Sequence, residues 1–163
     1  MAAPNVHLEI PPIKGDSKVD KYAEMVDCLS WSWGVSQAAN MHTSTGGSAG
    51  ASHVNDVVVV KGMDKSSSNF FHMCSTGKHF DKATLHCTKS AGDAGRIEWF
   101  TIIMERVVIS SVMPSGGGAG DMGTESITLN FGKYTIKYSE QGADGTAKAG
   151  PEVIYDITEA KKV

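Results

Sequence analysis

Cysteine is scarce in this chain, which has three among its 163 residues. Cys28, Cys74 and Cys87 lie far apart and form no Cys-x-x-Cys pair. Their spacing therefore argues against a disulfide-stapled fold and against a cysteine-built zinc site. We predict three small, buried hydrophobic side chains in a reducing compartment.

An excess of charge of either sign is also missing. The formal net charge is −3 and the pI is about 6.0, with both signs scattered along the chain. Such a balance does not attract a phosphate backbone and argues against a nucleic-acid-binding protein.

Long apolar runs are absent as well. No stretch approaches the roughly 20 apolar residues of a membrane-spanning helix, so we expect no membrane insertion. Residues 1–10 lack the basic region and apolar run of a secretory signal, which predicts a protein that starts in the cytoplasm. The length and a hydrophobic content of 40% predict a single domain over residues 1–163.

Motifs for catalysis or cofactor binding are lacking. The glycine-rich stretches contain no G-x-x-x-x-G-K-[ST] phosphate loop and no G-x-G-x-x-G between a strand and a helix. No two of the six histidines have helical His-x-x-x-His spacing, and His86 and Cys87 would point to opposite faces of a strand. We predict no catalytic residue, no metal and no cofactor. One alternative stays open: residues 46–50 read G-x-S-x-G around Ser48, as in hydrolases, although within a polar loop rather than between a strand and a helix.

What the sequence does contain is alternation with a period of two, which is typical of half-buried β-strands. It is visible in the following apolar sets: Val6, Leu8 and Ile10; Leu29, Trp31 and Trp33; Ile127, Leu129 and Phe131; Tyr134, Ile136 and Tyr138. The parity changes at Gly132, which predicts a bulge or tight turn there. Residues 56–60 and 97–112 are apolar on both parities for part of their length, which predicts strands covered on both faces.

One segment has a helical pattern. Residues 64–68, Asp-Lys-Ser-Ser-Ser, offer N-cap oxygens, an apolar face with Phe70, Phe71 and Met73 follows, and Gly77 supplies a stop. This predicts one short helix over residues 67–76 against the sheet. Three glycine-rich stretches, residues 36–52, 115–123 and 141–151, are expected to be long loops.

Several short motifs resemble the haemolysin-coregulated protein (Hcp) family. Residues 27–37 resemble the strand around its Trp-Ser-Trp-Gly core, and residues 63–66 with 74–80 resemble its helix and helix exit. Residues 125–131 resemble a late strand, and residues 6–17 its opening. The motifs occur in the family's order over nearly the whole chain, so the chain is identified from its sequence as a member of this family.

The resemblance implies an all-β, mainly antiparallel fold: a small β-barrel of two packed sheets with one short side helix, assembling as a hexameric ring. It further implies rings that stack into the inner tube of a bacterial type VI secretion system, inside a sheath and under a spike protein, with small effector proteins in the lumen. Such a subunit would be secreted by that system without a signal peptide. The alternative is a monomeric β-barrel module that binds a small ligand.

Two groups of residues are the candidate sites. If Trp31 and Trp33 face the core, Ser30 and Ser32 face the other way, and we expect these serines to line the channel. The uncharged stretch in residues 36–52 is expected to contact the next ring or the spike. Its candidate contact residues are Met41, His42, Thr43, Ser44, Thr45, Gly46, Gly47 and Ser48.

Overall fold

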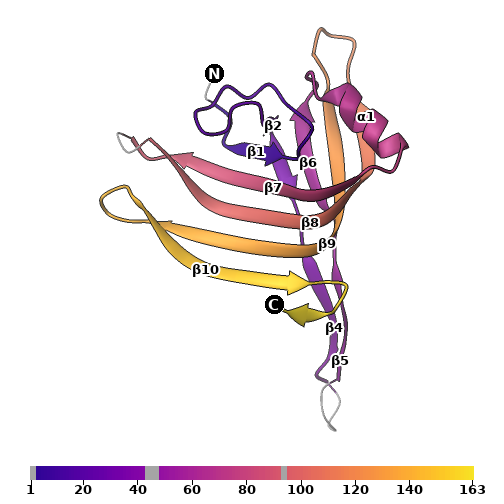
Figure 1. The fold of residues 1–163 in the computed structure, drawn as a ribbon, viewed down its shortest axis with the longest axis vertical. Coiled ribbons are helices and arrows are strands. Elements are labelled where there is room, and N and C mark those ends of the chain that lie inside the picture. Colours follow the sequence, from indigo (N-terminus) through magenta and orange to yellow (C-terminus); the bar gives the residue numbers. More distant parts are fainter. Residues whose placement is uncertain (1–2, 43–47, 93–94) are drawn as a thin grey trace.

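A computed structural model describes residues 3–42, 48–92 and 95–163 (Figure 1). Antiparallel strands dominate it, as the alternation predicts. The elements in chain order are β1 Val6–Glu9, β2 Val26–Cys28, β3 Ser30–Ser32, β4 Val35–Asn40, β5 Ser48–Val54, β6 Val57–Gly62, α1 Ser67–Ser75, β7 His79–Ser90, β8 Arg96–Ser115, β9 Thr124–Gln141, β10 Ala147–Asp156 and β11 Lys161–Lys162.

The strands close into a barrel. Hydrogen-bonded ladders run from β1 through β7, β8, β9 and β6 to β3, and β3 leads back through Leu29 to β2, which pairs with β1. The long strand β9 belongs to two parts of the sheet, because its first half pairs with β6 and its second half with β10. Strong bending of β8 and β9 is visible in Figure 1.

The reversal of faces at Gly132 is confirmed, but the predicted bulge or tight turn is wrong, because β9 continues through this position and its ladder with β8 has no register shift there. Ile127, Leu129 and Phe131 are buried before it and Tyr134 after it. The partner strand β8 changes phase at the same level, at Arg106, whose φ is 56°. A Cβ on residue 132 would lie 2.7 Å from the Arg106 Nε, so the arginine side chain crosses the backbone where only glycine leaves room.

The helix is confirmed, with differences in detail. Phe70 is fully buried, whereas Phe71, predicted to be a core anchor, is 38% exposed. Ser66 stands at the N-cap without a side-chain cap bond, because its hydroxyl donates to Asp64 Oδ1 instead. α1 lies across one end of the barrel beside β8 (Figure 1).

The predicted loop over residues 36–52 is wrong. β4 and β5 pair there as an antiparallel ribbon, in a separate sheet. The loop predicted over residues 115–123 is confirmed, since β8 ends at Ser115 and β9 begins at Thr124. The loop predicted over residues 141–151 is shorter, because β10 already begins at Ala147. Leu29 also differs from the prediction: it is 68% exposed at the corner between β2 and β3.

Candidate assembly and cargo surfaces

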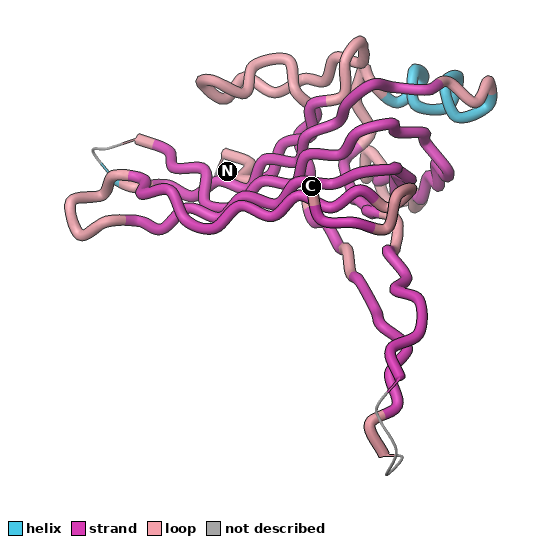
Figure 2. Tube along the Cα trace, turned by 60° about the horizontal axis from the view of Figure 1, so that its bottom comes forward, coloured by secondary structure: helices cyan, strands magenta, loops and turns pink. Residues whose placement is uncertain are grey.

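The β4–β5 ribbon projects away from the barrel (Figures 1 and 2). Every residue of β4 is exposed, and the pairing runs from Val35 with Val54 to Asn40 with Ser48. The close approach of the strands depends on Gly50, where a Cβ would lie 2.9 Å from the Ala38 Cβ. Small residues therefore form a thin ribbon here, while the usual alternation of large apolar and polar side chains is missing.

The root of the ribbon is anchored to the barrel. The Trp33 indole Nε1 donates to the Asn55 carbonyl over 2.9 Å, and the Asn55 N–H donates to the Gly34 carbonyl over 2.9 Å. The Trp33 ring also meets Tyr134 edge-on, with centroids 5.0 Å apart. The ribbon is thus held at a fixed point of the barrel wall.

Three of the predicted contact residues, Met41, His42 and Ser48, lie in the described part of this segment, next to or at the ends of β4 and β5. Met41 is 78% exposed and His42 is exposed, whereas Thr43, Ser44, Thr45, Gly46 and Gly47 lie outside the described residues. Ser48 begins β5. The element that follows is strand β6 rather than the helix that a G-x-S-x-G nucleophile elbow requires.

Ser30 and Ser32 lie on the outer face of the barrel wall and both are exposed. Trp31, between them, packs against the core, as predicted. Across the ladder Ser30 pairs with Val60 and Ser32 with Val58. The two serines therefore share their face with two partly buried valines.

The same face continues over two further strands. On β9, Thr128 pairs with Val58 and Ser126 with Val60, and on β8, Ser111 and Met113 come next. We name this surface the hydroxyl face; it consists of Ser30, Ser32, Val58, Val60, Ser126, Thr128, Ser111 and Met113. It holds hydroxyl and small apolar groups without a charge. The apolar run at residues 56–60 predicts that Val58 and Val60 are partly covered. The sequence alone does not show which strands lie beside these valines.

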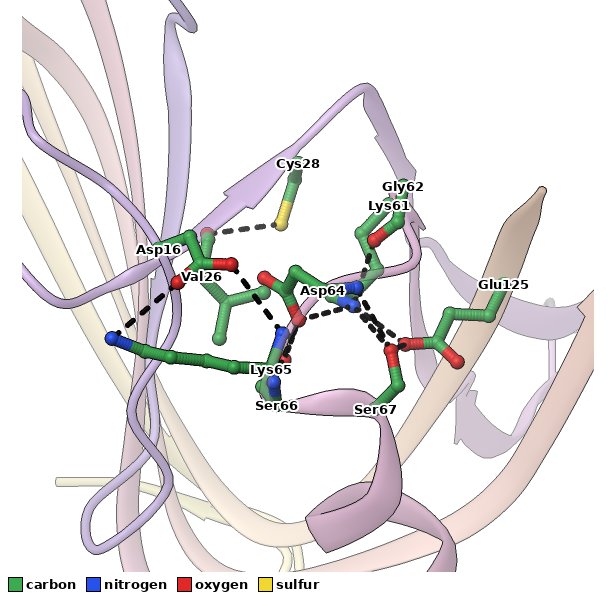
Figure 3. Close-up of polar contacts among 10 residues, drawn as sticks. All are labelled: Asp16, Val26, Cys28, Lys61, Gly62, Asp64, Lys65, Ser66, Ser67 and Glu125. Atoms are coloured by element: carbon green, nitrogen blue, oxygen red, sulfur yellow. Dashed lines mark hydrogen bonds and ion pairs between the residues drawn. The ribbon is translucent and has the colours of Figure 1, made fainter. Parts of the chain in front are cut away.

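A buried ion pair lies at the end of this wall, next to α1 (Figure 3). Lys61 and Glu125 are directly paired across β6 and β9, both side chains are 0% exposed, and Nζ lies 2.5 Å from Oε1. Ser67 at the start of α1 donates to the same Oε1 over 2.7 Å, and Asp64 Oδ1 lies 3.0 Å from the lysine Nζ. The network therefore joins β6, β9 and the helix entry.

The carboxyl group of Asp64, in the loop between β6 and α1, is held in its charged form. Burial acts to raise the pKa of Asp64, but hydrogen bonds from Ser66 and Lys61 outweigh burial and keep that pKa below its usual value. Among the described residues Glu125 Oε2 is buried without a hydrogen-bond partner, so the two bonds that Lys61 and Ser67 donate to Oε1 carry the compensation for this carboxylate.

Three other features of the described parts of the chain bear on function: its candidate metal ligands, its cysteine thiols and the length of its helices. Within residues 3–42, 48–92 and 95–163 no three His, Cys, Asp or Glu side chains are placed to hold a metal ion. Burial raises the pKa of the Cys28 and Cys87 thiols to about 12. Among the helices described, none has the length and apolar character needed to cross a membrane. The inside of the barrel is filled by side chains such as Leu8, Leu85 and Met104, all 0% exposed.

Comparison with known proteins decides the family. The family model "Type VI secretion system effector, Hcp" matches residues 7–138. The chain belongs to the Hcp family. It is 40% identical to protein hcp1 of Pseudomonas aeruginosa over 149 residues, which cover 91% of both chains.

Solved structures agree with this assignment. Hcp1 from Salmonella typhimurium superposes with a TM-score of 0.78 at 26% identity, covering 99% of this chain and all of the other. A type six secretion system protein reaches a TM-score of 0.91 at 24% identity with the same coverage, which supports the fold. The all-β barrel with one short helix is therefore the Hcp fold, and this member of the family is a component of the type VI secretion system.

Proposed function

We propose that this chain is a tube subunit of a type VI secretion system: six copies close into a ring, and rings stack through the β4–β5 ribbon. The observation that carries the proposal is the ribbon itself, an exposed and uncharged pair of strands anchored at Trp33 in a chain of the Hcp family. A head-to-tail contact repeated around a closed rotation gives a ring. Electron microscopy of the purified protein tests this, and we expect closed rings with a central channel.

We further propose that the hydroxyl face lines the channel and carries small effector proteins. Neutral groups let a client bind without the cost of desolvating a charge on the channel wall. The spike protein and the sheath are the further partners of such a tube. On this account the protein assembles in the bacterial cytoplasm and leaves through the type VI system.

Replacing Ser32 by glutamine should impair effector carriage and leave the ring intact. The longer side chain projects from the hydroxyl face, while the barrel ladder between β3 and β6 is untouched. The measurement is the amount of a co-expressed effector that co-purifies with the ring. Ser68→Gln, at an exposed position of α1, is the matched control and should carry effector like the parent. Equal carriage by both variants would remove Ser32 from the channel wall.

A further inference from the structure

A polar cluster lies where residues 11–25 fold over strands β1, β7 and β8. Tyr22 of this segment is 6% exposed and stacks on His7, with ring centroids 4.6 Å apart and planes at 13°. It meets His86 edge-on, with centroids 5.5 Å apart. Since His7 and His86 are directly paired across β1 and β7, one tyrosine covers both imidazoles.

The surroundings of His86 require a charged ring. Its Nδ1 lies 2.9 Å from Glu98 Oε1 and its Nε2 lies 3.4 Å from Glu9 Oε2. A neutral imidazole has one N–H, so donation to both carboxylates needs the imidazolium. Burial acts to lower the pKa of His86, but hydrogen bonds and charges of Glu98 and Glu9 outweigh burial and raise it.

The surroundings of His7 require a neutral ring. Its Nδ1 lies 2.9 Å from Asp27 Oδ1, while its Nε2 is buried and has no hydrogen-bond partner in the part of the chain that the structure describes. A second proton would place an unpaired N–H in the interior. Burial lowers the pKa of His7 more than Asp27 raises it, and the positive charges of Arg96 and His86 lower it further.

We propose that Tyr22, His7 and His86 form a pH-operated clasp, which holds residues 11–25 on the barrel most firmly when His86 is charged and His7 is neutral. Raising the pH removes one of the two N–H protons through which His86 bonds to Glu98 and Glu9. Lowering it puts a charge on the buried His7. Both changes act beneath the ring of Tyr22, whose hydroxyl donates to Glu98 over 2.9 Å.

Other titratable and charged groups also face the two imidazoles. Burial and then Glu98 raise the pKa of Tyr22, which stays a neutral donor. Burial acts to raise the pKa of Glu98, but His86 and Thr101 hold it down at about 2. Arg96 on β8 stays positive, and it donates to the Pro4 carbonyl over 2.7 Å. The carboxylates of Glu9 on β1 and Asp27 on β2 complete the set.

The two histidines act in opposite directions. The folded state binds the His86 proton more tightly than the unfolded chain, so its contribution is complete below the ordinary value of 6.5 and is lost as the pH rises through the raised pKa. The folded state binds the His7 proton less tightly, so its contribution is present above 6.5 and is lost as the pH falls through the lowered pKa. Both contributions are present together near pH 6.5, so the clasp is strongest there and weakens toward the folded-state pKa of either histidine.

Hydrogen exchange tests the clasp in the intact protein, since five amides donate to backbone carbonyls within residues 11–25. They are Gly15, Ser17, Tyr22, Glu24 and Met25. After correction for intrinsic exchange, their protection should peak near pH 6.5. It should fall by up to about tenfold for each pH unit on either side until the folded-state pKa is passed. Amides of the β8–β9 ladder serve as the reference and should not follow this profile.

Two variants separate the limbs of this profile. His86→Gln should abolish the fall at high pH, and His7→Gln the fall at low pH, whereas His72→Gln, at an exposed position of α1, should keep both. NMR titration of the unaltered protein should give His86 a pKa above 6.5 and His7 a pKa below it, independently of how the variants fold. The reverse order, or a flat protection profile across residues 11–25, would overturn the clasp.

Discussion

Lys61→Met should destabilise the barrel by about 3–5 kcal/mol, the usual loss when one partner of a buried ion pair is removed. The Glu125 side chain, which is 0% exposed, would lose the 2.5 Å contact between its Oε1 and the lysine Nζ and keep only the bond from Ser67. Its Oε2 has no partner among the described residues. The double variant Lys61→Met with Glu125→Leu removes both charges and should recover most of the loss. Urea unfolding followed by tryptophan fluorescence at one fixed protein concentration measures the difference.

A second cross-strand pair provides the matched control. Lys133 and Glu105 are also directly paired, between β9 and β8, with Nζ 3.2 Å from Oε2, but their side chains are 24% and 39% exposed. Because water screens such a pair, Lys133→Met should cost about 1 kcal/mol or less. If Lys61→Met costs no more than Lys133→Met, the buried network does not fasten β6 and α1 to β9.

Removing the β4–β5 ribbon should abolish tube formation while rings still form. Gln37 and Ser52 are directly paired, so residues 38–51 can be replaced by an Asn-Gly turn that suits a two-residue hairpin. The barrel ladders do not include these residues, so ring closure should survive. The milder variant Met41→Ser keeps the ribbon and removes its exposed apolar side chain, and should weaken stacking without ending it.

Electron microscopy and export from cells give the readout for both ribbon variants. We expect single rings and no export for the shortened chain, and shorter tubes for Met41→Ser. Tubes of parental length from the shortened chain would show that the ribbon has no part in stacking. Loss of rings as well would place the ribbon in ring closure.

The sequence predicts the barrel and its helix because regular periods carry that information. Alternation predicts the buried set Ile127, Leu129 and Phe131, and the i, i+3, i+4 spacing predicts α1 with Phe70 inside. Local rules do not say which of the two adjacent aromatic residues, Phe70 or Phe71, is buried. The partial exposure of Phe71 could therefore not be predicted from the sequence. The ribbon was missed because its small residues give no apolar alternation.

The polar interior was also missed, although a signal exists. Lys61 has the parity of the buried Val57 and Val59, and Glu125 has that of Ile127 and Leu129, so strict alternation points both charges inward. Charged residues are usually assigned to the surface, since burial is costly for an unpaired charge. Lys61 and Glu125 are 64 residues apart in the sequence. Their contact depends on the tertiary structure, so no local sequence pattern predicts it. The burial of His7 beneath residues 11–25 is of the same kind.

The mass of the native assembly tests the central claim most directly. Six copies of the 17.3 kDa chain form a closed ring of about 104 kDa, and native mass spectrometry should find this species with no abundant intermediate at micromolar concentration. Stacked rings would appear as multiples of it. A monomer as the dominant species under those conditions would contradict the account, and would favour a β-barrel module that works alone.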